Sequence, residues 1–350
     1  MNASATIRAS YIHQARMTFV PPNRPLSTFN KTNDIQARLA SDDKPSDFKQ
    51  VNHIEFREKC NDERTAAHHI YFDIEKNAHT NQAYIDITWM DTTPTFRQRV
   101  KKMYTICPYR DPIYLVAIVF FLGSIDLVID AFFDLLPHTI PSSAFETRET
   151  IAIPTTVLLG SIFFFAAGMF DTFGALNADS GTLVESKEEA GKMRFRPALL
   201  GSSEFRWVPS RVKVLDLAMN DLAFQAGLLV LFGGVVFMFA GIVDFPGLVS
   251  EESRAFGLVV FGPQVVHGAL FFVANLMLAV SAQTQWYRFR FYDADWLGAF
   301  LNAVGGLGFM LTGLFLFGKD EFRAAIAAMI GSWAFLVGSL VRWYVVMEFW

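Results

Sequence analysis

Cysteine and charge are both scarce in this sequence, and each shortage excludes a class of protein. Only Cys60 and Cys107 occur among 350 residues, too few for a disulfide framework. Charged residues make up 18% of the chain, below the roughly 25% that is usual in soluble domains. The chain also lacks a phosphate-binding glycine loop, a nucleophile elbow and a metalloprotease helix, so no familiar enzyme motif is available.

Long apolar runs are missing from residues 1–110 and frequent after them. Without an early run, no cleavable signal peptide is expected, and the first span must itself direct insertion. Six later runs each reach the roughly 20 residues needed to cross a hydrocarbon core. They lie at about 113–136, 151–175, 222–245, 256–281, 296–318 and 324–346. We therefore predict an all-α, polytopic membrane helix bundle of six transmembrane helices over 111–350, preceded by a largely disordered region at 1–110.

One pattern of small and aromatic residues recurs in all six runs. A pair of small residues, or His-Gly, is followed at position +4 by Phe or Leu and at position +8 by a small residue or Asn. On a helix these positions share an arc of about 100°. Such a stripe predicts a helix-packing face, because small residues let backbones approach inside a membrane. We interpret the Phe residues as core packing and expect no pigment or other cofactor. The pairs begin at Gly123, Gly160, Gly233, His267, Gly305 and Gly331.

The distribution of basic residues predicts the orientation. Fourteen Lys and Arg residues flank the spans on the side of the two termini, and four flank them on the other side. By the positive-inside rule both termini are cytoplasmic. The sequence does not resolve whether the membrane is the plasma membrane or an endomembrane.

Ionisable residues inside the runs are the best candidates for function, because they are costly at membrane depth. Asp126, Asp130 and Asp134 recur every four residues within an arc of about 80° in the first span. Together with His267 and Asn275 they could form a proton or cation path. The alternative is structural: Asp130 and Asp134 reach the interface or bond to Ser and Asn side chains, while His267 bonds to a neighbouring backbone or hydroxyl group.

Position +11 of the stripe is charged in four of the six copies. Asp134 and Asp244 are predicted to lie at the outer boundary of the membrane, and Asp171 and Arg342 at the inner boundary. We predict that Asp171 and Arg342 are near enough to form an ion pair.

Three further features lie before the first span. Cys107 is a candidate for S-palmitoylation in its basic, juxtamembrane setting. The basic cluster Arg97, Arg99, Lys101 and Lys102 could bind anionic lipid or serve only as a topology signal. Zinc binding is disfavoured, because the possible ligands match no regular spacing. Those ligands are His53, Cys60, His68, His69 and His79.

The closing segment Gly331-Ser332-Trp333-Ala334-Phe335-Leu336-Val337-Gly338-Ser339, followed by Arg342-Trp343, resembles the paired-helix YrhK-like membrane module. The similarity is clearest over 296–346, and concatenated versions look like those of fungal multi-span membrane proteins. The resemblance implies a membrane location and no particular activity.

Three functional classes stay open at this stage. The acidic face favours transport or ion permeation, and the packing stripes suit a non-enzymatic membrane organiser or accessory subunit equally well. An intramembrane enzyme is disfavoured, because the acids have neither a paired arrangement nor metal-ligand spacing. The lipid bilayer is the expected partner, no nucleic acid is expected, and protein partners are unknown.

Overall fold

The structure is a computed structural model that describes residues 3–18, 95–185, 193–250, 252–283, 285 and 287–350. It divides into two units. Met1–Ile12, Pro94–Thr182 and Arg196–Trp350 form the first, and His13–Thr93 with Leu183–Phe195 form the second. All helices long enough to span a membrane in the described residues belong to the first unit.

Six long apolar helices confirm the predicted architecture, and the chain is a multi-pass integral membrane protein. Every predicted boundary lies within three residues of the observed one. The helices are α6 (Pro112–Thr139), α7 (Ile153–Leu176), α9 (Leu222–Val243), α10 (Phe256–Ser281), α11 (Ala294–Phe317) and α12 (Glu321–Val346). A short π-helix at Arg148–Ala152 leads into α7, and 3-10 turns occupy Pro141–Ser143 and Met347–Phe349.

Aspartate side chains fix the beginning of four of these helices. Asp111, Asp221, Asp293 and Asp320 are the N-caps of α6, α9, α11 and α12. Each carboxylate accepts a hydrogen bond from a backbone N–H in the first turn, at 2.7 to 3.1 Å. A carboxylate satisfies otherwise unpaired donors there and complements the helix dipole.

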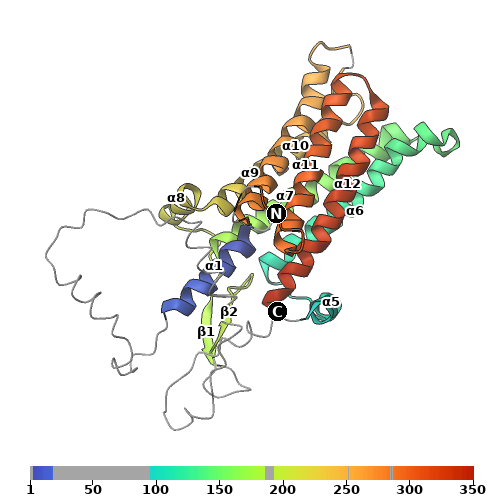
Figure 1. Cartoon of the computed structure of the whole chain (residues 1–350). Helices are drawn as coiled ribbons and strands as arrows, with labels where there is room; N and C mark the ends of the chain where they lie inside the picture. Colours follow the sequence, from blue (N-terminus) through green and yellow to red (C-terminus); the bar gives the residue numbers. More distant parts are fainter. Residues whose placement is uncertain (1–2, 19–94, 186–192, 251, 284, 286) are drawn as a thin grey trace, which may run out of the picture. The chain divides into compact units, whose positions relative to one another are not determined.

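The spanning helices form a closed ring in chain order, and Figure 1 shows them packed lengthwise as one bundle. Each packs against the next one in the sequence, and α12 returns to pack against α6. We call the end of the ring where α6 begins and α12 ends the terminal face. The other end, which carries the connections 140–152, 244–255 and 318–320, is the distal face.

The predicted stripes point into this ring. All six pairs of small residues, and the residues at +4 and +8 after them, are buried. Five of the +4 side chains meet as neighbouring rings, with centroids 5.2 Å apart for Phe164 and Phe335 and 5.7 Å apart for Phe309 and Phe335. Together with a Phe from α6 and the His from α10 they form what we call the aromatic layer: Phe120, Phe164, Phe237, His267, Phe271, Phe309 and Phe335.

Glycine lets α10 and α11 touch backbone to backbone. A Cβ added to Gly268 would lie 2.3 Å from the backbone nitrogen of Met310, and one added to Gly306 would lie 2.4 Å from that of Phe272. No side chain fits at either position, which explains the small residues there.

The elements outside the ring are short. They are α1 (Ala3–Thr18), α5 (Phe96–Thr105), α8 (Arg211–Asn220) and a hairpin of β1 (Thr182–Glu185) and β2 (Met193–Arg196). The hairpin was not expected. Residues 3–18 are helical within the region predicted to be largely disordered, because the first turns of α1 are held by buried carboxylates on the ring, as described below. Of the rest of the predicted region 1–110, residues 19–94 lie outside the described residues, and α5 occupies part of 95–110.

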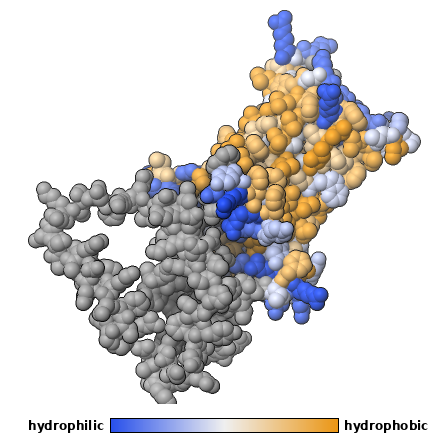
Figure 2. Space-filling view, viewed as in Figure 1, coloured by the Kyte–Doolittle hydropathy of each residue, from blue (hydrophilic) through white to orange (hydrophobic). Residues whose placement is uncertain are grey.

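Large apolar side chains cover the outside of the bundle. Figure 2 shows hydrophobic residues along the helices and hydrophilic ones gathered toward their ends. Exposed residues such as Leu122, Phe232 and Trp333 belong to this surface. An apolar belt of this kind suits contact with lipid tails.

Candidate functional site

The three aspartates of α6 lie along its packing contact with α7. Asp126 and Asp130 are buried, with 9% and 6% of their surface exposed, and Asp134 is half-buried. We call this line of carboxylates, which runs from the middle of α6 to the distal face, the acidic seam.

Asp130 has a direct partner on α7. The Thr156 hydroxyl donates a hydrogen bond to Oδ1 of Asp130 at 2.6 Å. The structural interpretation named Ser and Asn side chains as partners, whereas the donor to this carboxylate is a Thr hydroxyl on the neighbouring helix.

Asp126 is the deepest member of the seam and has less support. Its Oδ2 atom is buried and has no side-chain partner among the described residues, and the backbone of Gly160 on α7 is its only recorded hydrogen-bond support. A Cβ added to Gly160 on α7 would lie 3.0 Å from this oxygen, so the glycine leaves room for the carboxylate. A buried carboxylate with so little hydrogen-bond support is costly, and such a group commonly marks a functional position.

The seam ends among charged residues at the distal face. Asp130 and Asp134 repel each other, and Asp134 also experiences the charges of Asp244 and Arg148. The Arg148 guanidinium donates to the Phe133 carbonyl at 3.0 Å, which holds it beside the end of α6. Burial raises the pKa of Asp244, which lies just past the end of α9, to about 6.

His267 and Asn275 are separate from the seam, on α10. The His267 ring stacks on Phe237 with centroids 4.1 Å apart and 13° between the planes. Its Nδ1 lies 3.2 Å from the Pro263 carbonyl, which favours a proton on that nitrogen. Asn275 is fully buried and donates to the Phe271 carbonyl at 2.8 Å. The structure thus brings the three acids together and places His267 in the aromatic layer.

Asp171 and Arg342 have different partners in this structure. Asp171 accepts hydrogen bonds from the first turn of α1, at 2.6 Å from the Ser4 hydroxyl, 3.0 Å from the Ser4 amide and 3.3 Å from the Ala3 amide. Arg342 instead faces Asp295 at 3.5 Å. The charge of Asp171 still acts on Arg342, so the two are close without being hydrogen-bonded to each other.

A second buried contact of α1 was not predicted from the sequence. The Arg8 guanidinium forms two hydrogen bonds with Asp111, at 2.7 and 2.9 Å, and both side chains are almost fully buried. The Trp350 indole donates to the same carboxylate at 3.1 Å, and Arg8 lies over the Phe349 ring at 5.6 Å. We call this group, together with Ser4 and Asp171, the α1 seat.

The basic cluster before the first span lies on α5, where its members differ in accessibility. Arg97 and Lys101 are exposed, whereas Arg99 pairs with Glu348 at 3.1 Å and lies over the Tyr344 ring at 5.4 Å. Burial and the neighbouring Arg99 lower the pKa of Lys102. Arg97 and Lys101 therefore present the most accessible positive charge.

Of the remaining candidates, only Cys107 falls within the described residues. It is an exposed free thiol between α5 and α6. His53, Cys60, His68, His69 and His79 lie outside the described residues. No group of three potential metal ligands occurs in the part of the chain that the structure describes.

The comparisons with known proteins provide no relative, since no family model, no curated protein and no solved structure matches this chain.

Proposed function

We propose that this membrane protein moves protons or small cations, and that the acidic seam is the distal half of their path. The observation that carries the proposal is Asp126, a carboxylate buried at the contact of α6 with α7, whose Oδ2 has no side-chain partner among the described residues. A carboxylate held in this way gains from binding a proton or a cation. Asp130 and Asp134 supply the steps between it and the distal face.

The spacing of the three acids suits stepwise transfer. Residues four apart on a helix are separated by about 6 Å along its axis, a distance that one water molecule or a side-chain rotation can bridge. Asp134 takes the proton or cation at the distal face, Asp130 passes it on while bonded to Thr156, and Asp126 holds it beside the aromatic layer. His267 is the candidate for carrying the proton or cation across that layer, and Asn275 lies on the same helix nearer the terminal face.

The aromatic layer serves as the closed gate in this proposal. Rings from all six helices fill the ring at the depth of the +4 positions, so transfer from Asp126 to the terminal half requires those rings to move. Both termini are cytoplasmic, and the distal face is the side from which the proton or cation arrives. Exposed Arg97 and Lys101 contact anionic lipid, and Cys107 is the palmitoylation site.

Proton flux in proteoliposomes tests this function. The full chain is reconstituted, a potassium gradient with valinomycin sets the potential, and an internal pH dye reports proton entry. We expect Asp126→Asn to reduce flux at least tenfold, because the amide cannot take up a proton. Asp216→Asn, which removes an exposed carboxylate on α8, is the matched control and should leave flux unchanged.

A second variant tests transfer across the aromatic layer. His267→Phe keeps an aromatic ring against Phe237 and removes the titratable nitrogens, so flux should fall while the melting temperature changes little. Unchanged flux would remove His267 from the path. If Asp126→Asn also matches the wild type while remaining folded, the path proposal is rejected.

A membrane organiser or accessory subunit is the second candidate. The closed packing of the aromatic layer and the backbone contacts between α10 and α11 favour it, since a rigid ring suits scaffolding as well as gated transport. Absence of proton and monovalent-cation flux in the wild-type chain would select this function.

A further inference from the structure

Helix α8 has an exposed apolar stripe although it lies outside the spanning helices. Its inner side, Val214, Leu217 and Ala218, packs against a buried cluster at the ends of α7 and α9. On another side Val212, Leu215 and Met219 are 63% to 78% exposed. These three recur at the spacing of one helical face. A short helix with such a face lies at the membrane interface, with the stripe among the upper parts of the lipid tails.

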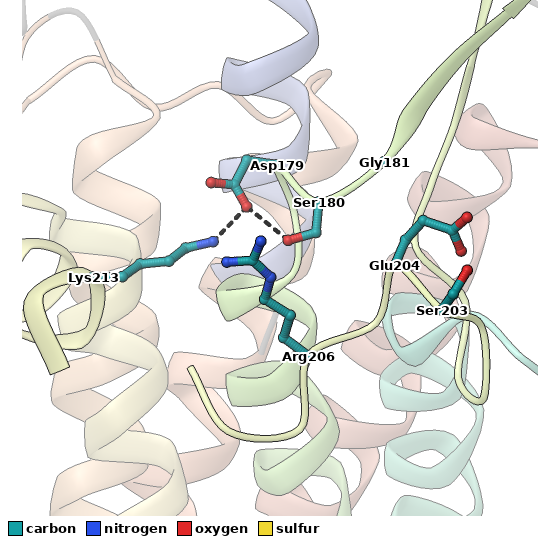
Figure 3. Close-up of a pocket in the computed structure, with 7 residues that line it drawn as sticks. All are labelled: Asp179, Ser180, Gly181, Ser203, Glu204, Arg206 and Lys213. Carbon is teal, nitrogen blue, oxygen red and sulfur yellow. Dashed lines mark hydrogen bonds and ion pairs between the residues drawn. The ribbon is translucent and has the colours of Figure 1, made fainter. Parts of the chain in front are cut away.

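A polar pocket opens beside the beginning of α8, at the terminal face (Figure 3). Its volume is about 370 Å³. The lining comes from the chain just after α7, from the segment that precedes α8 and from α8 itself. The polar residues are Asp179, Ser180, Ser203, Glu204, Arg206 and Lys213. Because the pocket adjoins the interfacial helix, it lies at the level of the lipid headgroups.

The wall that carries Arg206 is held in place by a buried amide. The side chain of Asn177, only 2% exposed, donates to the Arg206 carbonyl at 3.1 Å and accepts from the Arg206 amide at 2.8 Å. Phe205 is buried beside it, and Trp207 contacts the Phe173 ring at 5.6 Å. The half-exposed Trp207 fits the headgroup level, where Trp is common. The position of Arg206 is thus fixed before any ligand arrives.

The pocket is lined by two acids and two bases, and one of the acids, Glu204, faces away from the other three. Lys213 forms an ion pair with Asp179, whose carboxylate also accepts a hydrogen bond from the Ser180 hydroxyl at 3.2 Å. Figure 3 shows the Arg206 guanidinium beside this pair, with no interaction drawn to it, and the Glu204 carboxylate turned the other way. This corner therefore has a net positive charge and five guanidinium N–H donors, which suit a phosphate.

We propose that this pocket binds the phosphate of an anionic phospholipid from the leaflet at the terminal face. The lipid tails lie along the stripe of α8, and the phosphate bridges Arg206 and Lys213. The net positive corner favours phosphatidylglycerol over phosphatidylcholine, because the second lipid brings its own cation. The site is independent of the acidic seam and holds whether or not the chain transports ions.

Native mass spectrometry of the full chain in detergent tests the proposal with added phosphatidylglycerol or phosphatidylcholine. We expect Arg206→Gln to weaken phosphatidylglycerol binding at least fivefold while leaving the Asp179 ion pair intact. Arg206→Lys keeps the charge but loses the two-pronged geometry and should show an intermediate loss. Arg211→Gln is the matched control, since Arg211 is exposed at the start of α8 and does not line the pocket. It should change binding less than twofold.

Three results would overturn the proposal. Wild-type binding in Arg206→Gln would exclude the pocket, and an equal loss in Arg211→Gln would indicate general surface charge. Displacement of the lipid by an equal concentration of inorganic phosphate would indicate a soluble anion as the ligand. Melting temperatures of the variants confirm that folded protein is compared, and Arg206→Lys provides the test if Arg206→Gln does not fold.

Discussion

At the scale of single residues, the tightest packing lies where Gly268 meets the backbone of α11. We predict that Gly268→Ala destabilises the bundle by about 1 to 3 kcal/mol, the usual cost of overpacking. The added carbon would lie 2.3 Å from the Met310 nitrogen, and backbone cannot rotate away as a side chain can. The melting temperature in detergent should fall by several degrees.

A second glycine on the same helix provides the control. A Cβ on Gly262 would meet only the end of Leu258, at 3.7 Å, which is an ordinary contact. Gly262→Ala should therefore keep or slightly raise the melting temperature, since Ala favours the helix over Gly by about 1 kcal/mol. Equal effects of the two substitutions would show that close approach of α10 and α11 is not what requires glycine.

The residues of the acidic seam show what a single sequence can predict at this scale. The spacing of Asp126, Asp130 and Asp134 placed them on one helix face, and burial of Asp126 and Asp130 agrees with that. Their partners could not be predicted, because Thr156 and Gly160 carry no signal of their own until α6 and α7 are packed together. His267 was grouped with these acids as part of one path, but it lies apart from them in the aromatic layer. Its ring stacks on Phe237 of α9, which is separated from α6 by α7, and the sequence does not show which helix packs against His267.

At the scale of elements, α1 depends on one buried ion pair more than on its own sequence. We predict that Arg8→Met releases the first turns of α1, because Asp111 is then left buried without its cation, at a cost of about 3 to 5 kcal/mol. Amide exchange over residues 3–12 should speed up at least tenfold, as measured by mass spectrometry. The six spanning helices should keep their protection.

Arg99→Met is the comparison for that measurement. Arg99 also pairs with an acid near the terminal face, but its side chain and that of Glu348 are 13% and 20% exposed. An ion pair closer to solvent is worth about 1 kcal/mol or less, so exchange over residues 3–12 should stay at the wild-type rate. If amide exchange over residues 3–12 stays slow in Arg8→Met, the ion pair between Arg8 and Asp111 is not what holds α1 in place.

The helices differ in how well their presence and boundaries could be predicted from the sequence. Long apolar runs have no stable alternative to a helix inside a membrane, and the six predicted ranges therefore match the structure closely. Helix α1 has a composition that resembles disorder, and its order comes from Asp171 and Asp111, more than 100 residues away along the chain. A long-range contact of this kind leaves no periodic pattern. The same contact explains why Asp171 bonds to Ser4 where Arg342 was predicted.

At the scale of the whole molecule, the positive-inside prediction assigns the terminal face to the cytoplasm. In a background of Cys60→Ala and Cys107→Ala, Ser250→Cys on the distal face should react with an impermeant maleimide in intact cells. Ser203→Cys on the terminal face should react only after permeabilisation. Both positions are exposed. The reverse labelling pattern would invert the orientation and with it the direction assigned to the acidic seam.

The order of the helices around the ring could not be predicted from the sequence. Each stripe predicted an inward face but not which helix lies beside it, because small residues accept many neighbours. Because α12 packs against α6, the ring is closed and all six stripes face the same aromatic layer.

The α1 seat also has a consequence for biosynthesis. Arg8 can meet Asp111 as soon as the start of α6 has been made, but the Trp350 indole that shares this carboxylate lies 239 residues later. The ribosome must therefore deliver α12, and the ring must close, before the seat has all its members. The α1 helix is thereby anchored fully only on a chain whose helices have already been inserted and assembled, and a nascent or mispacked chain presents a loosely held amino-terminal segment to proteases.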